Sequence, residues 1–452
     1  MGKWGATAYI IGNIMGAGIF ISPASILVYT NSVGLALSIW ILSAIISILG
    51  AYTYVELGTS IRRSGADFAY LSFVNWKSIA FAFMTCGCIL VYPATLAIQA
   101  ATFSEYMIQT LNIKFENEWA LFASQKLIGF SLIWLILYLN FFSIKTFVSR
   151  FEIISAVAKL ASTGLVISIG MYYLIIKRKT EYLADPFANS TRDLGRIADA
   201  FFGGLFAYDG WDVLNFGVEE LDNPRTTMSF AIIVGMLTVA VVFCLMNLSF
   251  FVVLSAQEIT SSNAVASIFA QHTMGQFQYI IPILISLVLI GTFNGTMFAG
   301  SRYLFAASRQ RQFPAFLSCV NSKHDSPRAA LFIHVFLALC FSFAGNLSEL
   351  VNYVGFCYWA QRVLTTIALL YIRLFKIPVH PDAIKTPIIV PILFLVSCTA
   401  LCVVTIVQDF KSAFFGLLML FGAFVIYYLF VWEKACSEFH GTIGWLVGLM
   451  NL

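Results

Sequence analysis

Three glycines and a proline interrupt the first long apolar segment of the chain, at about residues 6–28. Each of Gly12, Gly16 and Gly18 weakens a helix by about 1 kcal/mol relative to alanine, and Pro23 removes a backbone donor. Unpaired backbone groups are very unfavourable in lipid, so a helix broken at this depth must face protein or a water-filled cavity. Amides freed at the break suit an anion such as a carboxylate. The pattern predicts half of a small-molecule site.

A second apolar segment, at about 197–220, is interrupted in the same way by Gly203-Gly204 and then Asp209-Gly210. If segments one to five and six to ten are two halves of opposite orientation, the interruptions lie in matching positions, as expected for a site between inverted repeats. Freed carbonyls at the second break would bind a cation, and an α-amino acid carries both charges on one carbon. Close helix packing is the alternative explanation of the glycines.

The composition limits the class of protein. Of the 452 residues, 60% are hydrophobic and 11% are charged, whereas a soluble domain is about 25% charged. The chain is therefore predicted to be an all-α polytopic membrane protein without a cleaved signal peptide. The net charge of +4 gives no support for nucleic-acid binding, and the nine cysteines show no metal-ligand spacing. No nucleophile, metal or cofactor motif indicates an enzyme.

Twelve apolar segments are predicted to span the membrane. Their approximate limits are 6–28, 33–60, 78–108, 127–144, 153–177, 197–220, 228–254, 277–304, 329–345, 349–372, 388–408 and 412–432. Basic loops follow the even-numbered segments, which predicts that these loops and both termini are cytoplasmic. The loop after the fifth segment, with Lys177, Arg178 and Lys179, conflicts with this orientation.

Two sequons lie in loops predicted to be outside. Asn189 and Asn346 each begin an Asn-X-Ser/Thr sequence and are predicted glycosylation sites. The sequons at Asn247 and Asn294 fall inside apolar segments and are interpreted as chance matches.

Several motifs resemble one family. The family motif G-S-G-I-F-x-S-P is similar to Gly16-Ala-Gly-Ile-Phe-Ile-Ser-Pro23. The sixth span of the family is similar to Gly204-Leu-Phe-Ala-Tyr-Asp-Gly-Trp211 and to the following Asn215-Phe and Glu219-Glu-Leu-Asp-Asn-Pro224. Asn294-Gly-Thr-Met-Phe and Ser301-Arg-Tyr-Leu-Phe resemble its eighth span. The family is the L-type amino-acid transporters, light chains of heteromeric exchangers within the amino acid–polyamine–organocation superfamily. The closest motifs are those of the cystine/dibasic–neutral exchanger branch.

The resemblance implies a leucine-transporter-type 5+5 inverted repeat plus two helices. The first repeat would cover 6–177, with its first helix broken at 16–18, and the second 197–372, with its helix broken at 207–210. Two helices at 388–432 and a short cytoplasmic tail at 433–452 would follow. The implied activity is sodium-independent exchange of neutral and cationic L-amino acids by alternating access at the plasma membrane. A neutral-only L-type exchanger and a sensor or receptor that does not transport are the alternatives.

The resemblance also implies positions for the substrate. Its carboxylate would meet amides near Gly16, Ala17 and Gly18. Its amino group would meet carbonyls of the two breaks, at Ile14, Phe206 and Asp209, with Ala207 and Gly210 in the same unwound segment. The Phe206 ring would act as a gate over the substrate.

Asp209 is the most informative charged residue. A carboxylate at the centre of a membrane helix costs at least about 2.5–3.5 kcal/mol, so a functional role is the first hypothesis. It would favour lysine, arginine or ornithine through charge pairing. The alternative is that Asp209 caps the second half of its helix. Asp212, which follows closely, is predicted to be a cap.

Lys159, in the fifth apolar segment, matches a family lysine whose ammonium resembles a substitute for a sodium ion. The alternative is that its side chain reaches for the nearby membrane interface. Asn294, in the eighth segment, is predicted either to line the pocket or to form an interhelical hydrogen bond. Glu219 and Arg225 could contribute to an inner gate, although solvated loop charges are the simpler interpretation.

The sequence differs from the family pattern in the loop that would bond a heavy-chain partner. Its light chains carry a cysteine between spans three and four that bonds a heavy chain, and the corresponding loop here, at 111–125, contains none. A disulfide-linked heavy chain is therefore not expected, while a non-covalent partner remains open. The expected ligands are amino acids and the lipid bilayer, with no cofactor, no metal and no nucleic acid.

Overall fold

The fold is a bundle of helices, seen here in a computed structural model that describes residues 2–63, 65–111, 113, 117–141, 145–218, 221–321 and 326–432. The first part of the chain forms α1 (Lys3–Ile14), α2 (Gly18–Thr30), α3 (Val33–Ser60), α4 (Ala66–Phe73), α5 (Lys77–Cys86), η1 (Gly87–Val91), α6 (Tyr92–Thr110), α7 (Glu118–Phe141), α8 (Lys145–Ile175) and η2 (Glu181–Leu183). The second part forms α9 (Leu194–Ala207), η3 (Val213–Phe216), α10 (Pro224–Val253), α11 (Ala256–Thr260), α12 (Val265–Thr273), η5 (Gly275–Phe277), α13 (Ile280–Arg309), η6 (Ala315–Ser318), α14 (Arg328–Phe341), α15 (Leu347–Leu374), α16 (Ile389–Gln408), α17 (Phe410–Ile426) and η7 (Tyr427–Val431).

Among the described residues, eight helices are long and apolar enough to cross a membrane, and α1 with α2 forms one further span bent by 47°. At the predicted sixth, ninth and tenth spans lie α9, α14 and α15, which do not meet the same criterion. Two of them, α9 and α14, have only 14 residues, and α15 carries Glu349, Arg362 and Arg373. A multi-pass helical membrane protein is therefore established, whereas the count of twelve stays a prediction.

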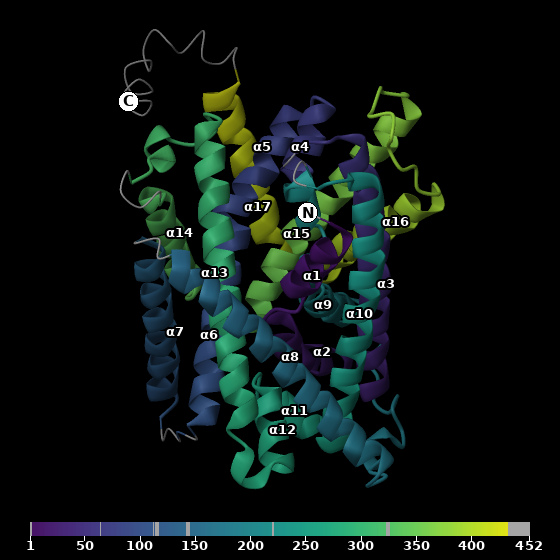
Figure 1. Cartoon of the computed structure of the whole chain (residues 1–452), viewed down its shortest axis with the longest axis vertical. Coiled ribbons are helices and arrows are strands. Elements are labelled where there is room, and N and C mark those ends of the chain that lie inside the picture. Colours follow the sequence, from purple (N-terminus) through teal and green to yellow (C-terminus); the bar gives the residue numbers. More distant parts are fainter. Residues whose placement is uncertain are drawn as a thin grey trace.

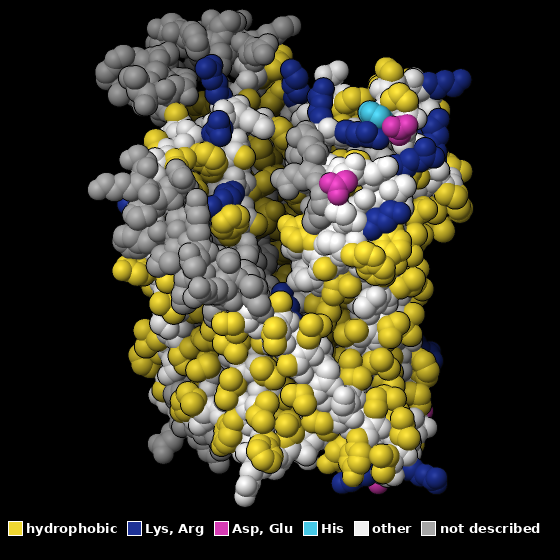
Figure 2. Space-filling model, viewed as in Figure 1, with side chains coloured by type: hydrophobic (Ala, Val, Ile, Leu, Met, Phe, Trp, Pro, Cys, Tyr) yellow, Lys and Arg dark blue, Asp and Glu magenta, His cyan; other side chains and the backbone are white. Residues whose placement is uncertain are grey.

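The broken helices lie inside the bundle. Figure 1 shows α1, α2 and α9 in the middle, with α7 and α14 toward one side and α3 and α16 toward the other. Large apolar side chains are exposed on outer helices such as α7, where Trp134 and Tyr138 are 49% and 59% exposed. Figure 2 shows apolar side chains over much of one face and Lys and Arg side chains gathered toward its upper end. This distribution is what a bilayer requires of a spanning protein.

Small residues let the inner helices approach closely. A Cβ atom on Gly170 of α8 would lie 2.1 Å from the Ser249 Cβ of α10. One on Gly291 of α13 would lie 2.1 Å from the Ser155 Oγ of α8. Because lipid provides no hydrophobic drive between helices, such close packing is a main source of their association.

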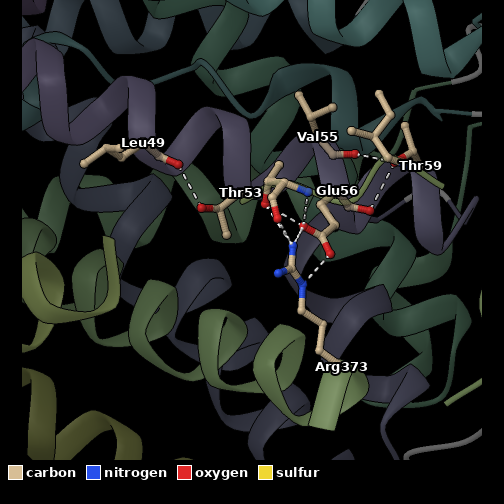
Figure 3. Close-up of polar contacts among 8 residues, drawn as sticks. Leu49, Thr53, Val55, Glu56, Thr59 and Arg373 are labelled. Atoms are coloured by element: carbon tan, nitrogen blue, oxygen red, sulfur yellow. Dashed lines mark hydrogen bonds and ion pairs between the residues drawn. The ribbon is translucent and has the colours of Figure 1, made fainter. Parts of the chain in front are cut away.

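A buried ion pair joins α3 to the end of α15 (Figure 3). Glu56 is 2% exposed, and its carboxylate accepts hydrogen bonds from the Arg373 Nε at 2.7 Å and from the Arg373 Nη2. The Thr386 amide and hydroxyl donate to the same carboxylate at 3.0 and 2.6 Å. The segment between α15 and α16 is thereby attached to α3. Every charged oxygen has a donor, as a buried pair needs.

We expect Glu56→Ala to lower the free energy of unfolding by about 3–5 kcal/mol, because the half-buried Arg373 then loses its carboxylate partner. Thermal unfolding of the purified protein in detergent measures the change. Asp382→Asn is the matched control, since it removes an exposed pair with Arg62 near the same segment and should shift the midpoint little. Equal shifts for both variants would contradict this role of Glu56.

Candidate functional site

The two helix breaks face each other at backbone distance. A Cβ atom added to Gly18, the first residue of α2, would lie 2.6 Å from the Ala207 Cα at the end of α9. Gly210 has a φ of +102°, and its Cβ would lie 3.4 Å from the Asn13 carbonyl carbon. Glycine is required at Gly18 by this approach and favoured at Gly210 by its backbone conformation. The segments predicted to form the site are therefore neighbours.

The first break leaves amides available. The chain is non-helical between α1 and α2, at residues 15–17. The Gly16 amide donates to the Ile14 carbonyl at 2.7 Å, so these two predicted site groups satisfy each other. In the part of the chain that the structure describes, the amides of Ala17, Gly18 and Ile19 donate to no backbone carbonyl. Three donors at the start of a helix form an anion-binding surface.

The second break leaves carbonyls available. After α9 ends at Ala207, the Phe206 carbonyl accepts the Asp209 amide at 3.3 Å. The carbonyls of Ala207, Tyr208 and Asp209 accept no backbone hydrogen bond from any described residue. Phe206 is half-buried. The Asp209 carboxylate interacts with the amide of Gly210, as a local cap would. This side of the site is rich in acceptors and suits a cation.

The breaks are held together by a buried hydrogen bond between their helices. The Ser22 hydroxyl of α2 donates to the Gly203 carbonyl of α9 at 2.7 Å. The side chain of Pro23 is buried beside it within α2, past the break rather than at it.

Lys159 reaches the first broken helix. Its Nζ, on α8, donates to the Gly12 carbonyl of α1 at 2.9 Å. The ammonium is thus directed at the helix end beside the break. The alternative prediction, a Lys159 side chain that extends to the membrane interface, does not include this hydrogen bond to Gly12.

Asn294 lies in an interhelical hydrogen bond. The Asn140 Nδ2 of α7 donates to the Asn294 Oδ1 of α13 at 2.9 Å. Asn247, the other sequon within a predicted span, is also buried. Asn189 and Asn346 are exposed in loops, where a glycan could be attached.

The structure describes only one of the two charged residues predicted to contribute to an inner gate. Glu219 lies outside the described residues, and Arg225 is exposed in the first turn of α10.

A buried charge cluster was not predicted from the sequence. Arg362 of α15 donates from Nη1 to Asp67 of α4 at 2.9 Å and from Nη2 to Asp212 at 2.6 Å. The three side chains are only 2%, 6% and 7% exposed. The prediction that Asp212 caps a helix is wrong, because its carboxylate makes no capping bond to η3. A charged guanidinium is a stronger donor for a carboxylate than a neutral amide.

One sequence signal pointed to this cluster. Arg362 stands in the middle of a predicted span, and intramembrane charges pair with one another. Asp212 is an acidic residue within another predicted span.

A small cavity of about 30 Å³ adjoins the charge cluster. Asp67 and Asp212 line it, as do Tyr92, Tyr303 and Tyr358. Tyr92 and Tyr358 are also electrostatic neighbours of Asp209. The cavity has room for one or two water molecules. It lies beside the second break, and its wall carries carboxylates and aromatic rings.

Comparison with known proteins assigns the family. Residues 1–430 match the model of the amino acid permease family. The chain belongs to this family. Amino acid transporter protein 6 of Caenorhabditis elegans is 50% identical over 97% of this chain and 84% of its own length. The human cystine/glutamate transporter is 34% identical over 94% and 84%, and the mouse Asc-type amino acid transporter 1 is 31% identical over 96% and 82%.

The resemblance found in the motifs is confirmed by these relatives, which are named as transporters and not as enzymes. The permease is an amino-acid transporter family member embedded in the membrane by several helices. The two facing breaks therefore lie in a protein of the class for which such breaks form substrate sites.

We expect Gly18→Ala to abolish amino-acid uptake and to destabilise the permease by about 1–3 kcal/mol, because the new Cβ would overlap the Ala207 backbone. Gly12→Ala is the matched control, since a Cβ there meets nothing within 4 Å. Uptake into proteoliposomes and thermal unfolding measure both effects. Wild-type uptake by the Gly18 variant would show that the breaks do not need this approach.

Proposed function

We propose that this permease is a sodium-independent exchanger of neutral and cationic L-amino acids that works by alternating access. The proposal is carried by one observation: amides without a backbone partner at one helix break lie beside carbonyls without a backbone partner at the other, among the described residues. An α-amino acid has the complementary pair of charges on one carbon.

The substrate carboxylate would bind the amides of Ala17 and Gly18, with the Ile19 amide as a third donor. The amino group would bind carbonyls of Ala207 and Asp209. The Ile14 and Phe206 carbonyls each accept one backbone hydrogen bond already, and each retains a second lone pair for the ammonium. The half-buried Phe206 ring stands at the same turn and would close over the substrate.

Helix packing supports two inverted repeats, at 6–177 and 197–372, followed by two helices at 388–432. The broken pair α1 and α2 corresponds to α9 and η3. α10 packs against α1, and α3 packs against α9, so the second helix of each repeat contacts the broken helix of the other. This exchange of partners is what a two-fold relation between the repeats predicts.

Lys159 supports sodium independence. Its ammonium occupies a position beside the end of α1, where it donates to the Gly12 carbonyl. A fixed cation at a broken helix supplies the positive charge that a bound sodium ion would otherwise supply. We therefore propose that the transport cycle needs no sodium.

The permease would reside in the plasma membrane with both termini in the cytoplasm and with glycans on Asn189 and Asn346. Exposure of both asparagines supports glycan attachment. The loop at 111–125 offers no cysteine for a heavy chain, so no disulfide-linked heavy chain is expected and a non-covalent partner is possible.

Asp209 supports acceptance of cationic side chains, because it is the carboxylate of the second break and neighbours the cavity tyrosines. We expect Asp209→Gly to reduce uptake of labelled lysine by about tenfold or more while leucine uptake changes little. Proteoliposomes in sodium-free buffer provide the measurement. The exposed Asp382→Asn variant controls for the loss of a carboxylate.

Two outcomes would contradict the proposal. Equal loss of lysine and leucine uptake would make Asp209 a structural cap. Uptake of leucine but not lysine by the wild-type protein would identify a neutral-only exchanger.

A further inference from the structure

Arg362 is enclosed on every side by groups that suit a guanidinium. Its two terminal nitrogens donate to Asp67 and Asp212. Its guanidinium carbon lies 4.8, 4.7 and 5.3 Å from the ring centres of Tyr54, Trp211 and Tyr358. Aromatic faces and carboxylates together stabilise a cation away from water. The positive charge of Arg362 is therefore stabilised by carboxylates and aromatic rings of the protein itself.

The two carboxylates are held differently. Asp67 also accepts hydrogen bonds from the Tyr54 hydroxyl and from the Thr365 hydroxyl, the latter at 2.7 Å. For the Asp212 carboxylate, the described hydrogen bonds include only the one from Arg362. Asp67 would thus keep Arg362 anchored if Asp212 lost its charge.

The two acidic residues of the cluster reach the cavity. Asp67 and Asp212 line the cavity wall, whereas Arg362 does not. From the cavity, the cluster presents acidic oxygens in front of a hidden guanidinium. Tyr92 and Tyr358 of this wall also interact electrostatically with Asp209. With Asp209 at the substrate side chain, as proposed, the charge at this wall acts on that side chain.

We propose that the negative charges of Asp212 and Asp67 mask Arg362, meaning that they offset its positive charge toward the cavity. This masking makes the site favour substrates with cationic over anionic side chains. Asp212 is the specificity-determining residue, and Arg362 is the positioning residue that holds it. Without the mask, the guanidinium would repel lysine and attract the carboxylate of glutamate. The inference rests on the proposed binding of amino acids between the two breaks.

A second arginine on the same helix provides the comparison. Arg373 also forms a buried pair with a carboxylate, Glu56. It lies 11 positions after Arg362, or about 16 Å along a helix, and neither partner lines the cavity. Loss of charge at Glu56 should affect stability without changing the preference for one sign of charge.

The test compares Asp212→Asn with wild type and with the matched control Glu56→Gln. Uptake of labelled lysine, leucine and glutamate is measured in proteoliposomes. For Asp212→Asn we expect the lysine-to-leucine uptake ratio to fall by about tenfold or more and glutamate uptake to appear. The ratio should stay at the wild-type value in Glu56→Gln.

The double variant Asp212→Asn/Arg362→Gln separates charge from structure. It removes the guanidinium as well, so glutamate uptake should disappear again while leucine uptake persists. If Asp212→Asn does not fold, Asp67→Asn removes the other mask and should shift the ratio in the same direction. A wild-type ratio in a folded Asp212→Asn protein that transports leucine would overturn the inference. Failure of the proposed function would appear separately, as a wild-type protein that does not transport lysine.

Discussion

The structure depends on one constraint: backbone groups freed inside an apolar bundle need partners. α1 stops at Ile14 and α9 stops at Ala207, in surroundings where water cannot satisfy every freed amide and carbonyl. Gly18 lets the two ends approach until the backbones touch. Donors of one break then lie near acceptors of the other. A zwitterionic ligand can complete the set, which links the cost of breaking two helices to the function of the permease.

Charges within the bundle are arranged around the same breaks. Lys159 is directed at the end of α1, and Arg362 is directed at Asp212 just after the break in α9. Each cation comes from a helix that would be the fifth of its repeat. The parallel suggests a common principle, in which a tethered cation fixes the charge of each broken helix.

The sequence predicted a break in each segment because the cause is local, but the prediction that Gly12, Gly203 and Gly204 interrupt their helices is wrong, since they lie inside α1 and α9. Glycines at Gly16, Gly18 and Gly210 weaken a helix wherever they occur, and the structure places non-helical backbone at 15–17 and 208–212. Long apolar stretches predicted α3 and α10 for the same reason. Such signals depend only on neighbouring residues, so one sequence is enough to find them.

The charge cluster could not be predicted in the same way. Arg362 and Asp67 are 295 positions apart, and Arg362 and Asp212 are 150 apart. The sequence near Asp212 predicted a helix cap, whereas in the structure its carboxylate pairs with the distant Arg362. Asn294 was similar, because only the fold could show that Asn140 is its partner. Three-dimensional proximity decided these contacts, and no spacing along the chain records it.

The most direct test of the central claim is a counterflow measurement on the purified wild-type protein. Proteoliposomes in sodium-free buffer are loaded with unlabelled leucine or left empty, and uptake of labelled lysine is followed. The account predicts rapid uptake into loaded vesicles and little into empty ones. Equal uptake into both would contradict exchange, and an absolute requirement for sodium would contradict the role given to Lys159.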